Sequence, residues 1–284
     1  MRFFVFKLRL IYIISISCLL VLFLISFAKA VDDREVVELP VIMYHSVLKD
    51  SSRRNEYIVT VEQFENDIKY LLNRGFVPIT IQDLSDYVYK NKRLPQKPVM
   101  LTFDDGFYNN ASYVYPYCLK YSFPIVISVV GKYTEIADAT DDVNPAYSYL
   151  RSKDIRELSQ SGLVEFVNHT YNLHSLDGGS KGSMKISWES DDDYYIRLKN
   201  DINKTQELLI QNTGHKPLAF TYPFGKISKA SYRVIDDMGF VASLSCFEGM
   251  NYISRDKECL RNLKRYNRSG MDTTNNFMKK LLSK

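Results

Sequence analysis

The chain has 284 residues, of which 45% are hydrophobic and 25% are charged, which is ordinary for a globular protein and excludes a disordered or fibrous chain. Its formal charge of +4 comes from the first 30 residues, which hold four basic and no acidic residues. The remainder has 33 basic and 33 acidic residues, so charge gives no reason to expect a nucleic-acid partner.

The first 30 residues are predicted to direct export. Basic residues at positions 2, 7 and 9 precede an apolar run over 10–27, and Ala28-Lys29-Ala30 supplies a small-residue cleavage pattern. The run of about 18 residues is at the lower limit for crossing a bilayer, so an uncleaved signal anchor is the alternative. We expect a protein that is secreted or attached to the outer face of the membrane or cell wall, and that contacts the membrane only through this segment if it is uncleaved. Residues 31–38 are predicted to form a short leader and residues 39–284 one large domain.

Strands and helices are predicted to alternate along that domain. Short apolar runs bounded by turn-forming residues predict strands over 40–45, 76–79, 99–103, 124–130, 163–167, 218–222, 240–246 and 259–263. Helical spacing of apolar residues predicts helices over 60–75, 81–89, 111–121, 152–161, 191–213 and 228–238. Residues 132–150 are predicted to be a loop, and residues 175–190 a long excursion.

The alternation implies right-handed βαβ units and a mostly parallel sheet, hence an α/β fold. The polar residues of interest each follow a predicted strand: His45, the Asp104-Asp105 pair, the stretch after Val167, and Tyr222 to Gly225. In a barrel of βα units these strand ends share one rim. A doubly wound sheet is the alternative, because its ligands also bind at the carboxyl ends of strands.

Two pairs of residues carry the chemistry. Adjacent carboxylates at Asp104 and Asp105 cost free energy unless a cation is near or one is protonated, although a solvated turn would also explain them. His169 and His174 are five residues apart, a spacing at which neither a helix nor a strand brings both imidazoles together. A turn favoured by Asn172 would do so, and two histidines with one carboxylate would form a three-ligand site for a divalent metal. Two loop histidines with ordinary hydrogen bonds are the alternative.

Three motifs together resemble the polysaccharide deacetylases, the NodB-homology carbohydrate esterases of family 4. They are Thr102-Phe103-Asp104-Asp105-Gly106, His169-Thr170 followed after three residues by His174, and Tyr222-Pro223-Phe224-Gly225. They occur in the family's order, and the resemblance covers roughly residues 38–268. The Met43-Tyr44-His45 strand end, placed before the aspartates, is similar to the permuted branch that deacetylates extracellular poly-N-acetylglucosamine. The resemblance implies a distorted (β/α)7 barrel.

The resemblance also implies roles for these residues. Asp104 resembles the general base, His45 the general acid, and Asp105, His169 and His174 the metal ligands. The turn formed by Tyr222, Pro223, Phe224 and Gly225 would bind substrate, with the backbone N–H of Phe224 stabilising the oxyanion. Zinc is the expected metal, with cobalt, iron, nickel and manganese as alternatives. A histidine that only caps a loop is the alternative for His45.

The implied reaction is hydrolytic removal of N-acetyl groups from N-acetylglucosamine units of an extracellular or cell-wall polysaccharide. Poly-N-acetylglucosamine, a biofilm polymer, is favoured as the substrate and peptidoglycan comes next. The alternatives are a non-catalytic glycan-binding protein on the same fold and an O-acetyl ester hydrolase.

The chain departs from the family pattern at one arginine. Many relatives have an arginine shortly before the Pro-aromatic-Gly motif, whereas this chain has Leu218-Ala219-Phe220-Thr221 there. Arg265 is a candidate to orient the base instead, and a surface position is the alternative. Cys246 and Cys259 are candidates for a disulfide, which the sequence neither establishes nor excludes.

Overall fold

The computed structural model describes residues 14–23, 36–176 and 181–282. The chain divides into two compact units, Met1–Val36 and Val37–Lys284, and the fold described below is that of the second unit. Residues 14–23 are helical, while the remainder of the predicted export segment, including the cleavage pattern at Ala30, lies outside the described residues. In the part of the chain that is described, no helix has both the length and the apolar character needed to cross a membrane.

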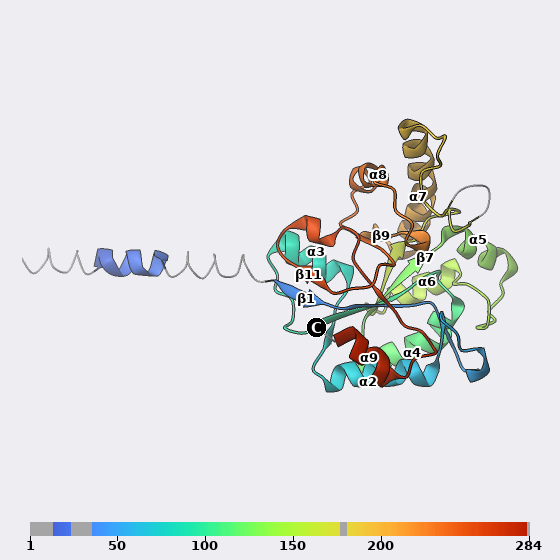
Figure 1. Cartoon of the computed structure of the whole chain (residues 1–284), viewed down its shortest axis with the longest axis horizontal. Coiled ribbons are helices and arrows are strands. Elements are labelled where there is room, and N and C mark those ends of the chain that lie inside the picture. The colour runs from blue at the N-terminus through green and yellow to red at the C-terminus, as the bar shows by residue number, and fades with distance from the viewer. Residues whose placement is uncertain (1–13, 24–35, 177–180, 283–284) are drawn as a thin grey trace, which may run out of the picture. The chain divides into compact units, whose positions relative to one another are not determined.

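The second unit is built around a curled, entirely parallel sheet of seven strands in the order β10-β9-β8-β7-β6-β2-β12. Figure 1 shows strands in the interior of this unit with helices around them. These strands are β2 (Val41–Tyr44), β6 (Pro98–Phe103), β7 (Ile125–Val129), β8 (Val164–Asn168), β9 (Ala219–Thr221), β10 (Ala242–Leu244) and β12 (Tyr266–Asn267). The short strand β5 (Val77–Pro78) pairs with β6 beside this path. The predicted α/β fold with a parallel sheet is confirmed, and the sheet forms a half-barrel.

One run of chain reaches both ends of the sheet. Leu263 forms a parallel bridge with Leu244 of β10, and three residues later Tyr266 pairs with Ile42 of β2. The residues between them therefore cross the space between the first and last strands. The side chain of Arg265 lies in this crossing segment, which places it near the ends of the central strands.

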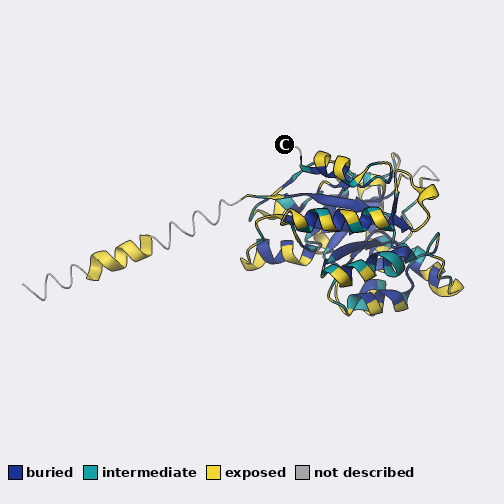
Figure 2. Ribbon diagram, turned by 90° about the horizontal axis from the view of Figure 1, so that it is seen from below, coloured by how far each residue is buried: buried dark blue, intermediate teal, exposed yellow. Residues whose placement is uncertain are grey.

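Helices cover the outside of the sheet, and most show one buried and one exposed face (Figure 2). They are α2 (Val61–Asn73), α3 (Ile81–Lys90), α4 (Tyr115–Tyr121), α5 (Gly131–Thr140), α6 (Ser152–Ser159), α7 (Asp191–Thr213), α8 (Ser231–Asp237) and α9 (Thr274–Leu282). The predicted bounds of α7 are confirmed. Thr60 followed three residues later by Gln63 is the sequence pattern of a capping box, and at the start of α2 the two residues do exchange hydrogen bonds of 2.9 and 3.0 Å.

Shorter elements complete the fold. Two small sheets pair β1 (Val37–Leu39) with β11 (Asn251–Ile253) antiparallel, and β3 (Ser46–Leu48) with β4 (Ile58–Thr60) parallel. Single turns of other helix types lie at Ser51–Arg53, Asn110–Val114, Pro223–Gly225 and Lys257–Leu260. Strand β1 takes in the last two residues of the predicted leader, because its backbone pairs with β11.

Two predicted elements are wrong. Residues 132–150 are not all loop, because α5 occupies Gly131–Thr140. Its buried face consists of Gly131, Thr134 and Ala137, and such small side chains give no hydrophobic periodicity. The predicted strand over 259–263 is also absent: Lys257–Leu260 is a 3-10 turn, and the last strand is β12. A strand of two residues flanked by arginines carries no recognisable strand pattern.

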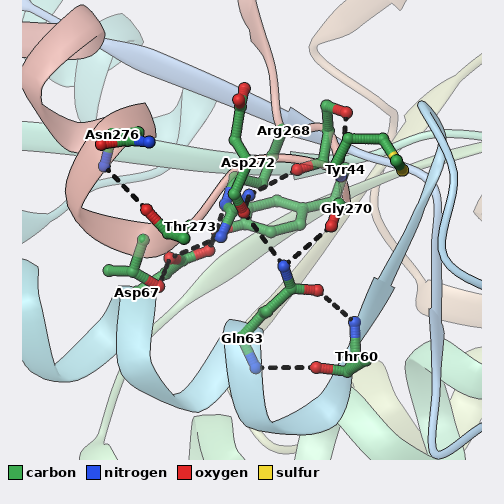
Figure 3. Close-up of polar contacts among 12 residues, drawn as sticks. Tyr44, Thr60, Gln63, Asp67, Arg268, Gly270, Asp272, Thr273 and Asn276 are labelled. Carbon is green, nitrogen blue, oxygen red and sulfur yellow. Dashed lines mark hydrogen bonds and ion pairs between the residues drawn. The ribbon is translucent and has the colours of Figure 1, made fainter. Parts of the chain in front are cut away.

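A buried polar network attaches the C-terminal segment to α2 and β2 (Figure 3). The Asp67 carboxylate accepts hydrogen bonds from Arg268 Nε at 2.7 Å, the Tyr44 hydroxyl at 2.9 Å and the Thr274 hydroxyl at 2.6 Å. The side chains of Asp67 and Arg268 are both 0% exposed. The network therefore holds α9 beside α2 and anchors the end of β2, directly before His45.

We expect the Asp67→Ala variant to lose about 3–5 kcal/mol of unfolding free energy, because it leaves the Arg268 guanidinium buried without its partner. Urea unfolding followed by circular dichroism measures this loss. The matched control is Glu62→Ala on the same helix, since Glu62 is exposed. Its cost should stay within about 1 kcal/mol. Equal losses of unfolding free energy in the two variants would show that the buried ion pair stabilises the fold no more than the exposed carboxylate of Glu62 does.

Candidate active site

The loops after β2, β6, β8 and β9 meet at one rim and line an open cleft of about 790 Å³. Six of the predicted site residues face this cleft: His45, Asp104, Asp105, His169, His174 and Phe224. These residues come from four separate parts of the chain. The structure therefore brings the predicted base, acid and metal ligands together at the carboxyl ends of parallel strands.

Asp105 and the two histidines form a compact cluster of ligand atoms. Asp105 Oδ1 lies 3.2 Å from His174 Nε2 and 3.6 Å from His169 Nε2, and one ligand atom from each residue lies within 4.8 Å of the others. Asp105 and Gly106 both have left-handed backbones, with φ of 70° and 68°, which turn the carboxylate away from the strand direction. Asp105 Oδ1 is buried and makes no hydrogen bond within the described residues. One carboxylate and two imidazoles aimed at a common point fit a divalent metal.

The turn after β8 orients the first histidine. His169 Nδ1 lies 2.8 Å from the Thr221 carbonyl, to which it can only donate a proton, so Nε2 keeps its lone pair for a metal. Thr170 has the left-handed backbone in this turn, with φ of 71°. Asn172, which was expected to favour this turn, lies in the bend that follows Thr170 and donates its backbone N–H to Asp201 of α7 at 2.9 Å.

Burial and neighbouring charges set the protonation of this cluster. Burial lowers the pKa of His169 to about 4, which keeps its imidazole neutral as a ligand must be. Burial also opposes a charge on His174, but the Asp105 carboxylate outweighs it and raises the pKa of His174. Burial would raise the pKa of Asp105, but His174 and the other nearby histidines lower it. Asp105 is therefore the anionic member of the ligand set.

Asp104 is held by an arginine that is distant in sequence. Arg265 donates from Nη1 to Asp104 Oδ1 at 2.7 Å and from Nη2 to Oδ2 at 2.8 Å. Burial would raise the pKa of Asp104, but the Arg265 charge outweighs it and holds this pKa well below its usual range. Arg265 also donates from Nε to the Ser245 carbonyl at 2.7 Å. Its side chain is 0% exposed, so a surface position for Arg265 is excluded.

His45 follows β2 directly and lines the same cleft. Its ring packs edge-on against the ring of Tyr57, with centroids 5.0 Å apart. The backbone N–H of Asp104 donates to the Tyr44 carbonyl at 3.0 Å, which ties the end of β2 to the Asp104-Asp105 turn. The predicted acid and base are therefore carried by adjacent, hydrogen-bonded strand ends.

The turn from Tyr222 to Gly225 presents only part of itself to the cleft. Phe224 has a left-handed backbone, with φ of 56°, and its ring lies 4.5 Å from that of His174. Tyr222 and Pro223 are buried, and the Tyr222 hydroxyl bonds Ser231 at 2.8 Å. The side chains of Tyr222 and Pro223 pack into the interior, so of this turn only Phe224 lines the cleft, and substrate binding by the turn stays a prediction. Gly225 is needed where it is, since a Cβ there would lie 2.7 Å from Cys246 Cβ.

Cys246 and Cys259 do not form a disulfide, and every cysteine in the described part of the chain is free. Cys246 lines the cleft with its sulfur 3.8 Å from Arg265 Nη2. The Cys259 thiol donates to the Ser254 carbonyl at 3.6 Å. The two thiols thus belong to separate local environments.

Sequence reasoning missed several residues around the cleft. Four aromatic residues line it without having been singled out: Tyr57, Phe107, Tyr147 and Tyr149. Asp201 was missed as well, although it supports the turn that carries the histidines. The position of Phe107, directly after the Asp-Asp-Gly turn, was a usable signal. The others are brought to the cleft by loops whose course the sequence does not reveal.

The comparisons with known proteins agree with this geometry. Residues 91–243 match the family model "Polysaccharide deacetylase". The poly-beta-1,6-N-acetyl-D-glucosamine N-deacetylase of Escherichia coli K12 is 24% identical over 217 residues, covering 70% of this chain and 32% of that protein. The protein of the same name from Staphylococcus aureus strain MSSA476 is 28% identical over 205 residues, covering 70% of this chain and 64% of that protein.

Solved structures share the fold. A de-N-acetylase from Aggregatibacter actinomycetemcomitans superposes with a TM-score of 0.73 at 22% identity, over 86% of this chain and all of that one. A Streptococcus pyogenes deacetylase in complex with acetate gives a TM-score of 0.69 at 20% identity, over 87% of this chain and 99% of that one. The predicted distorted barrel of the NodB type is confirmed by these likenesses.

The family model matches more than half of the chain, and the chain belongs to the polysaccharide deacetylase family, a family of hydrolases. The resemblance carried by the three motifs is therefore confirmed. The chain spans about a third of the length of the E. coli relative.

Proposed function

We propose that the protein is a metal-dependent de-N-acetylase that acts on N-acetylglucosamine units of an extracellular polysaccharide. One observation carries this proposal: a three-ligand cluster lies in one cleft beside an arginine-held carboxylate and a histidine. The non-catalytic alternative was motivated by the missing family arginine. The bidentate contact of Arg265 with Asp104 removes that motivation.

The residues divide the hydrolysis of an acetamide among them. A divalent metal held by Asp105, His169 and His174 would polarise the acetyl carbonyl and acidify a water molecule. Arg265 keeps Asp104 ionised and occupies one lone pair on each carboxylate oxygen, so each oxygen can still accept a proton from water. We assign Asp104 the role of general base in that step.

His45 completes the reaction because an amine is a poor leaving group unless it is protonated. We assign His45 the donation of a proton to the departing nitrogen. The tetrahedral oxyanion requires a hydrogen-bond donor, and we assign this role to the backbone N–H of Phe224, whose ring lies beside His174.

We propose poly-N-acetylglucosamine as the preferred polymer and peptidoglycan as the next candidate. Two relatives, from E. coli and S. aureus, bear the name of poly-beta-1,6-N-acetyl-D-glucosamine deacetylases. The cleft is lined by the partly exposed rings of Tyr57 and Tyr147, flat apolar surfaces of the kind that sugar rings can contact. We propose zinc as the metal, because two imidazoles and one carboxylate suit it.

We expect the purified protein to release acetate from N-acetylglucosamine oligomers and to stop when a chelator has removed its metal. Acetate is assayed on β-1,6-linked oligomers, on peptidoglycan and on an acetylated xylan ester in parallel, with elemental analysis of the protein before and after chelation. Added zinc should restore the activity. Release that survives complete metal removal would contradict the mechanism, and release from the ester alone would identify an O-acetyl esterase.

We further propose that residues 1–30 direct export and that the protein works outside the cytoplasm. This proposal is supported by the basic segment, the apolar run and the small-residue pattern at the start of the sequence. Cell fractionation, with mass spectrometry of the mature N-terminus, decides between cleavage after Ala30 and retention as an anchor. An intact protein confined to the cytoplasm would refute the proposal.

A further inference from the structure

Two buried polar atoms at the cleft are not explained by the reaction as assigned so far. The first is His45 Nδ1 and the second is Asn267 Oδ1. Each is closed off from solvent and lacks a hydrogen-bond partner among the described residues, although both residues line the cleft. A buried donor or acceptor without a partner loses its hydrogen bonds to water and gains none in return, so such atoms are rare unless they serve a purpose.

The strand register places these two residues on the same side of the sheet. Asn267 of β12 pairs with Met43 of the parallel strand β2. Met43 and His45 are two residues apart, so their side chains point to the same face. Asn267 and His45 are therefore neighbours on adjacent strands, and both face the cleft.

The orientation of the Asn267 amide is determined by its other end. Asn267 Nδ2 donates to the Glu56 carbonyl at 3.0 Å, which identifies the nitrogen and leaves Oδ1 as the unpaired acceptor. Tyr57 follows Glu56 directly and packs its ring on that of His45. The backbone carbonyl of Tyr57 accepts a hydrogen bond from the backbone N–H of Ser46 at 3.2 Å. The loop that holds the Asn267 amide thus also holds the imidazole.

The two unpaired atoms are chemically complementary. An amide oxygen can only accept, and an imidazole Nδ1 can carry the proton to be donated. A histidine with one nitrogen held in this way presents the other in a defined direction. For His45 that other nitrogen is Nε2.

We propose that Asn267 is a positioning residue for His45, whose Nδ1–H it accepts at Oδ1 once a rotation of either side chain brings together the two atoms, which are both left without a partner in the described residues. The bond sets the ring so that Nε2 points at the departing nitrogen of the substrate. This inference rests on the proposed function, because it assumes that His45 is the general acid. The role belongs to β12, a strand that the sequence did not reveal.

A second buried amide lies beside His45. Asn110 Oδ1 is also buried without a partner, and Asn110 Nδ2 donates to the His45 carbonyl at 3.3 Å. That amide approaches the backbone of His45, and Asn110 does not line the cleft. Asn110 is therefore the matched comparison, because it is a second buried asparagine beside the same histidine.

Nitrogen NMR of the metal-loaded protein tests the bond without an activity assay. The chain has only four histidines, so the resonance of His45 can be assigned by substitution. We expect the proton of neutral His45 to reside on Nδ1 in the unchanged protein and in Asn110→Ala, and to redistribute towards Nε2 in Asn267→Ala. An unchanged tautomer in Asn267→Ala, or a change only in Asn110→Ala, would overturn the proposal.

Kinetic constants distinguish a role of Asn267 in positioning His45 from a purely structural role through its bond to the Glu56 carbonyl. Asn267→Ala should lower kcat about tenfold or more, with unchanged KM and metal content, because only proton delivery is impaired. Asn267→Asp keeps an acceptor oxygen but loses the donor to Glu56, so it should recover most of kcat. Equal losses in both variants would show that only the bond to Glu56 matters, which contradicts the proposal. If the unchanged protein releases no acetate at all, the proposed function fails, while the tautomer still tests the bond.

Discussion

The Asp104→Asn variant should bind metal as well as the unchanged protein and release acetate about a thousandfold more slowly. An amide has the size of the carboxylate but cannot take a proton from water. Asp104 is not part of the ligand cluster, which consists of Asp105 and the two histidines. Metal content by elemental analysis and acetate release on the same preparation measure the two effects separately.

Asp105→Asn is the matched control for this experiment. It makes the same chemical change one residue along the chain, and it removes the anionic member of the ligand set. We expect this variant to lose metal and therefore activity. If Asp104→Asn instead lost the metal while Asp105→Asn kept it, the roles assigned to the two aspartates would have to be exchanged.

Replacing Arg265 should have the second-largest effect, on both stability and activity. Arg265→Met leaves Asp104 buried without its partner, and breaking a buried ion pair from one side costs about 3–5 kcal/mol of unfolding free energy. Acetate release should fall as well, because Asp104 loses both hydrogen bonds that orient it. Urea unfolding and kcat on N-acetylglucosamine oligomers measure the two losses.

Arg265→Lys distinguishes charge from geometry. Lysine keeps the positive charge but cannot form the planar, two-bond contact, so it should recover more of the stability than of kcat. An Arg265→Met variant that is as stable and as active as the unchanged protein would show that the contact with Asp104 has no consequence.

Local patterns in the sequence predicted the parts of the fold that depend on local physics. The long helix α7 has the predicted bounds, and the capping box at Thr60 and Gln63 forms as expected. Most strands of the sheet were predicted because buried strands are continuous apolar runs. The residues at the strand ends could be grouped because parallel strands present their carboxyl ends on one side.

Other parts of the fold carry no local signal. The buried face of α5 is made of small residues, and β12 is two residues long and flanked by the buried side chains of Arg265 and Arg268. Neither produces a hydrophobic pattern, because the contacts that stabilise them come from elements far away in the chain. Predicting β12 would require Asp104 and Asp67, the partners of its flanking arginines, to be placed first.

By itself, the sequence determined which residue types follow which strands, and hence a cluster of one carboxylate and two histidines beside a second carboxylate and a further histidine. Only the tertiary structure decided how Asp104 is held, because Arg265 lies 161 residues away and reaches it where the segment before β12 crosses between the two ends of the sheet. The same strand brings Asn267 beside His45. The physical reason is that charge pairing and hydrogen bonding act through space, so their partners follow from the curvature and closure of the sheet and not from spacing along the chain.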